Sequence, residues 1–494
     1  MLSLYTLILG AVSVYAAANY PPIPADLTTP VQQRIAIQSP NQISVAWNTY
    51  TKLAQACVQY GTSSKSLRSK ACSQNAVTYP TSRTYFNTVQ LTGLKPATTY
   101  YYKIVSTNSS TQQFFSPRVA GDTTPFTLNA VIDMGVYGTD GYTIDMDMSK
   151  RSTIPTLDPS LNHTTIGRLF NNLKQYEFII HPGDLAYADD WYEKAHNFLD
   201  GTNAFEAILE QFYEQLAPIS GVKPYMASPG NHEADCTEVP NTAGACAEGQ
   251  RNFTDFNNRF GASMPKAFVS TSKSSAAKIN ANKAAQLAKP PFWFSFEYGM
   301  VHVTMIDTET DFANAPDGPG GSAGLNGGPF GFTNQQLEFI DADLASVDRT
   351  VTPWVIVAGH RPWYTTGTGC APCQSAFESL LYKYGVDLAV FGHVHNSQSI
   401  VPIYNGTADP NGFKDPKAPY YIVAGGAGNI EGLSSASNPP SYISFAYDTD
   451  FSYATIQLAD KNHMNINFIR SYTGEILKSQ TLYKSHSHQF VRNI

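Results

Sequence analysis

Short hydrophobic stretches separated by turn residues occupy the first part of the chain, from about residue 20 to residue 121. At 42–47 apolar and polar residues alternate, and at 99–105 aromatic and β-branched residues follow one another. Both patterns are typical of β-strands, and this range has no helical period. About 100 residues of short strands predict an all-β sandwich of the fibronectin III or immunoglobulin type at 20–121.

After a short linker at 121–125, the pattern changes to strands that alternate with helices. Apolar strands are predicted at 128–132, 177–181, 225–228, 354–358 and 386–391. Amphipathic helices are predicted at 167–176, 205–216, 334–345 and 375–384. This alternation predicts an α/β domain at 126–480.

Two insertions interrupt the α/β pattern. One is rich in Ser, Ala and Lys (270–289), and the other is rich in glycine (311–331). The glycines lack the Lys-Ser/Thr ending of a phosphate-binding loop. Both insertions are therefore predicted to be surface loops.

Five short motifs lie directly after the predicted strands. They are Ile-Asp-Met-Gly (132–135), Gly-Asp-Leu-Ala-Tyr (183–187), Gly-Asn-His-Glu (230–233), Val-Ala-Gly-His (357–360) and Gly-His-Val-His (392–395). The carboxyl ends of strands in an α/β sheet gather binding residues at one edge. We therefore expect seven side chains to meet there, namely Asp133, Asp184, Tyr187, Asn231, His360, His393 and His395.

The chemistry of these side chains indicates metal binding. Each has an ordinary explanation alone, but the chain places four of its 11 histidines in these motifs. Tyr187 is the most informative, because a phenol with a pKa near ~10 binds as phenolate to a strongly Lewis-acidic ion such as Fe³⁺. The alternative is a core or surface tyrosine.

A second, divalent ion (Zn²⁺, Fe²⁺ or Mn²⁺) is predicted at Asn231, His360 and His393, with Asp184 bridging the two ions. Two ions about 3.5–4 Å apart can clamp the attacking and leaving oxygens of phosphoryl transfer. This pattern predicts a dinuclear metallophosphatase. His232 is predicted to donate to the phosphoryl oxygens, and the alternative is a histidine that supports the ligands.

Composition limits the classes of partner. A chain of 494 residues with 42% hydrophobic and 12% aromatic residues is globular and long enough for more than one domain. The net charge of −7 argues against nucleic-acid or anionic-membrane binding. The apolar stretch at 1–18 ends in small residues and predicts a secretory signal peptide, with a buried N-terminal strand as the alternative. No later stretch has the ~18 apolar residues of a membrane span.

Cysteines and sequons fit an extracellular protein. The six cysteines form three close pairs, which predict local disulfides: Cys57/Cys72, Cys236/Cys246 and Cys370/Cys373. A redox or zinc motif is the alternative for the last pair, whose spacing is Cys-x-x-Cys. Glycosylation is predicted at four sequons, Asn108, Asn162, Asn252 and Asn405.

Taken together, the five motifs resemble those of the purple acid phosphatases in the calcineurin-like metallophosphoesterase superfamily. The likeness covers nearly the whole mature chain, since the large plant and fungal forms also carry an N-terminal fibronectin-like domain. The resemblance implies an α/β metallophosphoesterase sandwich of two mixed sheets flanked by helices. It also implies a tyrosinate-to-iron colour and hydrolysis of phosphate monoesters by a metal-bound hydroxide. The implied ligands are Asp133, Asp184, Tyr187 and His395 for Fe³⁺, and Asp184, Asn231, His360 and His393 for the divalent ion.

The chain departs from the family pattern at two places. Ile132 stands where the first motif usually begins with Gly, and no histidine pair follows His360 in 361–370. The general acid for the leaving group is therefore unassigned. His196 is one candidate, and the alternative for it is a surface helix residue.

These features predict a secreted acid phosphatase that hydrolyses small phosphate monoesters, with phytate as one candidate. The alternatives are a phosphodiesterase or pyrophosphatase on the same scaffold, or a non-catalytic binding protein. The N-terminal sandwich is predicted to have a structural or dimerisation role, so a homodimer is a further expectation. No nucleic-acid partner is expected.

Overall fold

The computed structural model describes residues 18–106, 108–141, 164–234, 245–316 and 332–487. The predicted signal peptide at 1–18 therefore lies almost entirely outside the described residues. Within the described ranges, no helix has the length and apolar character needed to cross a membrane.

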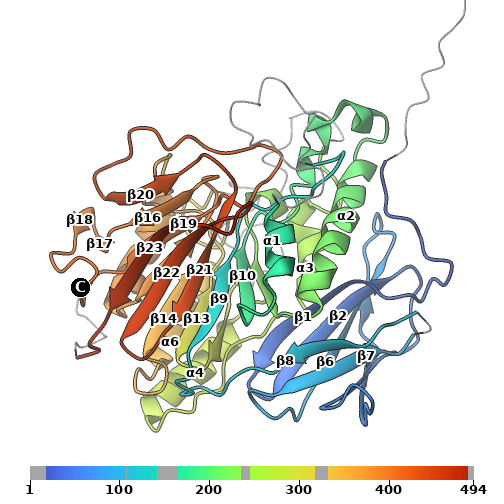
Figure 1. Ribbon diagram of the computed structural model, residues 1–494, viewed down its shortest axis with the longest axis horizontal. Helices are drawn as coiled ribbons and strands as arrows, with labels where there is room; N and C mark the ends of the chain where they lie inside the picture. Colours follow the sequence, from blue (N-terminus) through green and yellow to red (C-terminus); the bar gives the residue numbers. More distant parts are fainter. Residues whose placement is uncertain (1–17, 107, 142–163, 235–244, 317–331, 488–494) are drawn as a thin grey trace, which may run out of the picture.

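Two antiparallel sheets form the N-terminal β-sandwich (Figure 1). Their strand orders are β1-β2-β6-β5 and β4-β3-β7-β8. The strands are β1 (Val31–Ser39), β2 (Gln42–Thr49), β3 (Ala56–Gly61), β4 (Ser69–Ser73), β5 (Ala76–Val77), β6 (Tyr85–Leu91), β7 (Thr99–Ile104) and β8 (Gln112–Phe115). Inward-facing side chains such as Trp47, Val89 and Tyr102 are fully buried. The predicted all-β fold is confirmed.

A six-stranded mixed sheet begins the α/β region, with the order β11-β10-β9-β21-β22-β23. The strands are β9 (Phe126–Ala130), β10 (Phe178–Pro182), β11 (Tyr225–Ser228), β21 (Ser452–Leu458), β22 (His463–Arg470) and β23 (Ile476–Tyr483). Strands β9, β10 and β11 are parallel, and β21 to β23 pair antiparallel. The parallel half brings the first three motifs to one edge.

A seven-stranded mixed sheet packs against the first, with the order β12-β13-β14-β15-β19-β16-β20. Its strands are β12 (Phe294–Tyr298), β13 (Val301–Met305), β14 (Trp354–Ala358), β15 (Leu388–Phe391), β16 (Ser397–Ile400), β19 (Tyr420–Ala424) and β20 (Ile443–Tyr447). A small hairpin, β17 (Ile403–Tyr404) and β18 (Thr407–Ala408), follows β16. Aromatic pairs cross between the two sheets, with ring centroids 5.8 Å apart for Phe178 and Phe296 and 5.2 Å apart for Phe445 and Phe468.

Helices flank these sheets (Figure 1). They are α1 (Thr165–Asn171), α2 (Asn203–Ser220), α3 (Thr254–Phe260), α4 (Ser275–Leu287), α6 (Gln335–Ser346), α7 (Ala371–Cys373) and α8 (Ser379–Lys383), with a π-turn, η5 (Gln374–Glu378), between α7 and α8. Short 3₁₀ turns are η1 (Asp189–Glu193), η2 (Ala195–Leu199), η3 (Asn231–Glu233) and η4 (Arg251–Phe253). Helix α2 also packs against β1 of the N-terminal sandwich. The predicted α/β sandwich of two mixed sheets with flanking helices is confirmed.

One prediction about local structure was wrong. The Ser/Ala/Lys-rich insertion at 270–289 was expected to be a loop, but most of it forms α4, which packs against α6. Ala277, Ala281 and Ala284 lie on one face at helical spacing and are buried. The glycine-rich insertion is described only at 311–316, so that prediction lies largely outside the described residues. The domain limits 20–121 and 126–480 stay predictions, with β8 ending at Phe115 and β23 at Tyr483.

Candidate metal centre

The predicted ligands follow the strand ends closely. Each first ligand of a motif comes two or three residues after its strand: Asp133 after β9, Asp184 after β10, Asn231 after β11, His360 after β14 and His393 after β15. The backbone there turns sharply, with left-handed φ values of 53–64° at Asp133, Asp184, Tyr187 and His393. Such conformations cost on the order of 1–3 kcal/mol each in residues other than glycine, and they occur often at functional sites.

The glycine that begins the second motif, Gly183, allows its loop to approach His360 closely. Gly183 has a φ of 99°, and a Cβ at this position would lie 2.6 Å from His360 Nδ1. A larger residue would therefore both strain the turn and displace His360.

The Tyr187 hydroxyl is the centre of one group of donors. It lies 3.1 Å from Asp133 Oδ1, 3.3 Å from Asp184 Oδ2 and 2.9 Å from His395 Nε2. Ligand atoms of Asp133, Asp184 and His395 all lie within 4.8 Å of one another. These are the four residues expected for the ferric ion.

His360 is the centre of a second group. Its Nε2 lies 3.0 Å from Asp184 Oδ2 and 2.9 Å from Asn231 Oδ1. Ligand atoms of Asp184, His360 and His393 again lie within 4.8 Å of one another. Asp184 is thus common to both groups, as a bridging carboxylate must be. The structure brings all seven predicted side chains together.

Glu233 ties the second and third motifs to each other. Its carboxylate accepts hydrogen bonds from the backbone N–H groups of Asp184 (2.9 Å), Leu185 (2.8 Å) and Gly230 (2.9 Å). Two loops from different strands are therefore held by one partly buried side chain. The sequence placed Glu233 within a motif, but nothing in its spacing identified this role.

His232 lies next to the ligand groups and is held in a defined orientation. Its Nδ1 lies 2.9 Å from Asp189 Oδ1, and its Nε2 faces Asp184 Oδ2 at 3.8 Å. Burial opposes a charge on the ring, but Asp189 and Asp184 raise the pKa of His232 well above its usual value. These carboxylates therefore favour the protonated ring, which can donate a hydrogen bond beside the centre.

The electrostatics of the ligands suit cations. Burial raises the pKa of Asp133 well above its ordinary range, and the Asp184 carboxylate raises it further. Burial also raises the pKa of Tyr187 far above its usual value, with Asp133 and Asp184 adding to the effect. This phenol keeps its proton unless a cation takes its place. Carboxylates, a phenol, an amide oxygen and imidazoles fit a ferric and a divalent ion in these two groups.

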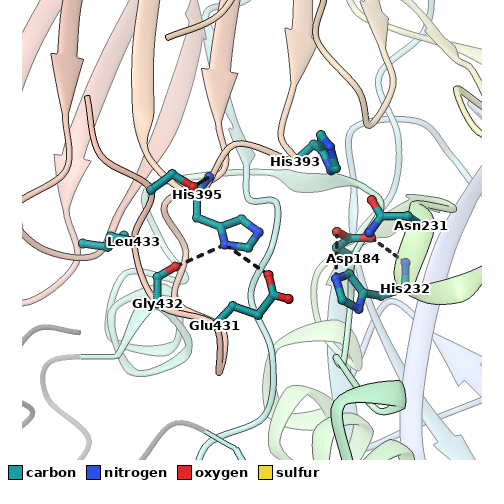
Figure 2. Close-up of a pocket in the computed structure, with 9 residues that line it drawn as sticks. Asp184, Asn231, His232, His393, His395, Glu431, Gly432 and Leu433 are labelled. Atoms are coloured by element: carbon teal, nitrogen blue, oxygen red, sulfur yellow. Dashed lines mark hydrogen bonds and ion pairs between the residues drawn. The ribbon is translucent and has the colours of Figure 1, made fainter. Parts of the chain in front are cut away.

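A cavity of about 280 Å³ opens at the centre. Figure 2 shows His395 and Glu431 on one side, and His393, Asn231 and His232 on the other. The remaining wall is Asp184 with 432–434 from the loop after β19. His395 Nδ1 lies 3.2 Å from the backbone oxygen of Gly432 and 3.7 Å from Glu431 Oε2. Glu431 was missed from the sequence because this loop carries no motif.

Arg361, which directly follows His360, is a second residue that sequence reasoning missed. Its Nε donates to Glu309 Oε2 at 2.7 Å, and its Nη1 lies 2.9 Å from His393 Nε2. After burial, this guanidinium is the main cause that lowers the pKa of His393 well below its usual value. A positive charge thus stands beside the second ligand group, that of Asp184, His360 and His393.

His196 is not among the residues that line this cavity. Its Nε2 pairs with Asp140 Oδ1 at 2.6 Å, and its side chain is 38% exposed. Its role as a proton donor stays a prediction that no contact described here supports.

The cysteine pairs follow the prediction as far as the structure describes them. Two are disulfides, Cys57–Cys72 between β3 and β4 and Cys370–Cys373 at α7. Because Cys370 and Cys373 bond to each other, they do not form a zinc site. Cys246 is also disulfide-bonded, but its predicted partner, Cys236, lies outside the described residues. The pairing of Cys246 with Cys236 therefore stays a prediction.

The sequons are described at three of their four positions. Asn108, Asn252 and Asn405 are exposed, as a modified asparagine must be. Asn162 lies outside the described residues. Glycosylation stays a prediction at all four.

Comparisons with known proteins agree with this geometry. Residues 161–397 match the family described as Calcineurin-like phosphoesterase. Residues 30–118 match "Purple acid Phosphatase, N-terminal domain", and residues 418–479 match "Iron/zinc purple acid phosphatase-like protein C". With buried His/Asp clusters after the strands of two mixed sheets, the chain is a calcineurin-like metallophosphoesterase, a hydrolase.

Individual relatives show which family of metallophosphoesterases is most similar to this chain. "Acid phosphatase A" of Cryphonectria parasitica is 63% identical over 488 residues, which are 97% of each chain. "Acid phosphatase" of Aspergillus ficuum is 27% identical and covers 84% of this chain and 78% of its own. The solved purple acid phosphatase PPD1 from yellow lupin (Lupinus luteus) seeds has the same fold, with a TM-score of 0.66 and 22% identity over 92% of this chain and 75% of its own. This chain belongs to the purple acid phosphatase family.

Proposed function

We propose that this phosphatase is a secreted enzyme that hydrolyses phosphate monoesters at an Fe³⁺–M²⁺ centre, where M is Zn²⁺, Fe²⁺ or Mn²⁺. The observation that carries the proposal is the sharing of Asp184 by two ligand groups. One group contains a phenol and two carboxylates, which suit a hard trivalent ion, and the other has one carboxylate and neutral donors.

The chain's own residues bind the ions, donate hydrogen bonds to the substrate and hold the ligand loops in place. Ions held there would supply Lewis acidity and an acidified water as the nucleophile. His232, aligned by Asp189 at 2.9 Å, donates a charge-assisted hydrogen bond to the phosphoryl oxygens. Glu233 keeps the Asp184 and Asn231 loops in register, and the left-handed turns hold the ligand side chains inward.

Other expectations belong to this proposal. Secretion rests on the apolar segment at 1–18, and glycosylation rests on the sequons. The name of the Cryphonectria parasitica relative supports acid phosphatase activity. Phytate as a substrate and a homodimer through the N-terminal sandwich stay predictions.

Rates on a phosphate monoester and its matched diester, measured between about pH 3 and pH 8 on protein of known metal content, test the proposal. We expect acid-range activity that favours the monoester. A preference for the diester would replace the monoesterase proposal by phosphodiester hydrolysis. Inactivity on both substrates in protein with both ions bound would refute the proposed function.

A further inference from the structure

Arg361 occupies a fixed position at the edge of the metal centre. Its backbone N–H donates to Thr308 Oγ1 at 2.8 Å, and the same oxygen accepts from the N–H of His360 at 3.2 Å. The backbone of a predicted ligand and that of Arg361 are thus held by one hydroxyl. The Cα of residue 361 is therefore fixed next to the ligand group that contains His360.

The side chain reaches from a buried carboxylate to a cavity-lining histidine. Glu309 is fully buried and accepts a hydrogen bond from Arg361 Nε, while Arg361 Nη1 lies 2.9 Å from His393 Nε2. The Arg361 side chain is 17% exposed, whereas that of Glu309 is 1% exposed. Glu309 therefore holds the Nε side of the guanidinium, and the Nη1 side lies against the metal centre.

The contact with His393 cannot persist in the loaded enzyme. A neutral imidazole has one accepting nitrogen, and guanidinium groups only donate. If His393 binds an ion through Nε2, the lone pair that faces Arg361 is used. If it binds through Nδ1, the ring carries its hydrogen on Nε2 and no longer accepts. In either case the Nη1 hydrogen that faces His393 turns to a different acceptor.

We propose that Arg361 binds a non-bridging phosphoryl oxygen of the substrate, with Glu309 as the residue that positions it. Arginine matches phosphate with parallel donors and keeps its charge across the working pH range. It would add a fixed cation beside His393, one of the residues that line the cavity. This inference rests on the proposed phosphatase function for its choice of anion.

Affinity for inorganic phosphate, measured by calorimetry on the metal-loaded protein, tests this role. Arg361→Gln should weaken phosphate binding about 10- to 100-fold, the range of a lost charge-assisted hydrogen bond, with both ions retained by elemental analysis. Arg361→Lys should recover part of the loss, because it keeps the charge without the fork. Glu309→Gln should weaken binding less than Arg361→Gln does.

Arg83→Gln is the matched control. Arg83 of the N-terminal sandwich forms a comparable pair with Glu210 of α2 at 2.6 Å, with side chains 26% and 6% exposed. We expect its phosphate affinity to equal that of the wild type. Wild-type phosphate affinity in Arg361→Gln with both ions bound would overturn the inference, and so would loss of an ion from both Arg361 variants, since that would make Arg361 a support for His393.

A crystal structure of the wild-type, metal-loaded protein with phosphate needs no variant. It should place the Arg361 guanidinium within about 3.2 Å of a phosphate oxygen. A guanidinium that contacts only protein atoms would refute the role. A wild type that binds phosphate through Arg361 but hydrolyses no ester would refute the proposed function alone.

Discussion

The metal centre and the interface between the catalytic region and the N-terminal sandwich both bury carboxylates, but they balance the charge differently. At the interface, Asp255 meets Arg259 at 2.9 Å, and both residues are at least 95% buried. At the centre, the partners of Asp133 and Asp184 are imidazoles, a phenol and backbone N–H groups.

The different charge balance indicates that the carboxylates of the interface serve stability, whereas those of the centre serve function. A buried carboxylate costs several kcal/mol unless a cation and hydrogen bonds compensate it. At the interface, arginines of the chain itself balance the charge of the buried carboxylates, so no bound ion is needed. The centre gathers carboxylates, a phenol and imidazoles in strained turns, and this favours bound metal ions as the balancing charge. The same substitution should therefore have different consequences in the two regions.

Asp184→Asn should have the largest effect. It removes the carboxylate that both ligand groups share, so both sites lose affinity at once. We expect kcat to fall about a thousandfold or more, and the metal content to fall below one ion per chain. Elemental analysis and steady-state kinetics measure this, and retention of two ions with near-normal kcat would show that Asp184 is not shared.

Asp255→Asn makes the same chemical change at the interface. It leaves Arg259, only 3% exposed, without its charge partner. Loss of one partner of a buried pair lowers the free energy of unfolding by about 3–5 kcal/mol. Denaturant unfolding should show this loss, whereas kcat per folded, metal-loaded molecule should stay within about twofold of the wild type, since the interface contributes no group to the cavity. A large fall in kcat would contradict the conclusion that the interface serves stability alone.

His232→Ala tests the donor beside the centre. We expect kcat to fall about 100-fold with both ions retained, because the imidazole contributes a hydrogen bond to the reacting group rather than a metal ligand. His463→Ala, on an exposed strand start, serves as the control and should leave kcat unchanged. Loss of an ion in His232→Ala would instead make His232 a support for the ligands.

A buried carboxyl at the interface, that of Glu206, should make the free energy of unfolding depend on pH. Burial raises the pKa of Glu206 to about 7, although hydrogen bonds from Thr81 and Tyr79 act in the opposite direction. A carboxyl with a folded-state pKa above its unfolded value of 4.5 contributes stability at low pH, and this contribution is lost as the pH rises through about 7. Unfolding free energy should fall by up to about 3 kcal/mol between pH 5 and pH 8 from this group.

Glu206→Gln carries no titrating proton and should flatten this part of the pH dependence. Thermal unfolding of wild type and variant at the two pH values provides the measurement. An equally steep fall in both proteins would assign the pH dependence to other groups.

Sequence reasoning predicted the centre better than its surroundings. Asp133, Asp184 and His360 lie at strand ends, where the topology of an α/β sheet decides which residues meet. Glu431 and Arg361 act through loop and side-chain conformations that only the packed structure defines. Their types alone, an acid in a loop and an arginine after a histidine, are too common to be informative.

The fold shows the same limit. β11 and β14 begin and end as predicted, because each is a short buried run of apolar residues. Helix α4 was missed because its buried face consists of alanines, and its Ser- and Lys-rich remainder is also typical of loops. The alanine face packs against α6, a contact that no local pattern shows.

The metal stoichiometry and visible spectrum of the purified protein, with Tyr187→Phe beside the wild type, test whether the centre holds two ions and a tyrosinate ligand. We expect two ions per chain, one of them iron, and a visible band that Tyr187→Phe removes while substantial hydrolysis remains. A single ion per chain, or a band that is unchanged in Tyr187→Phe, would contradict a two-ion centre with a tyrosinate ligand.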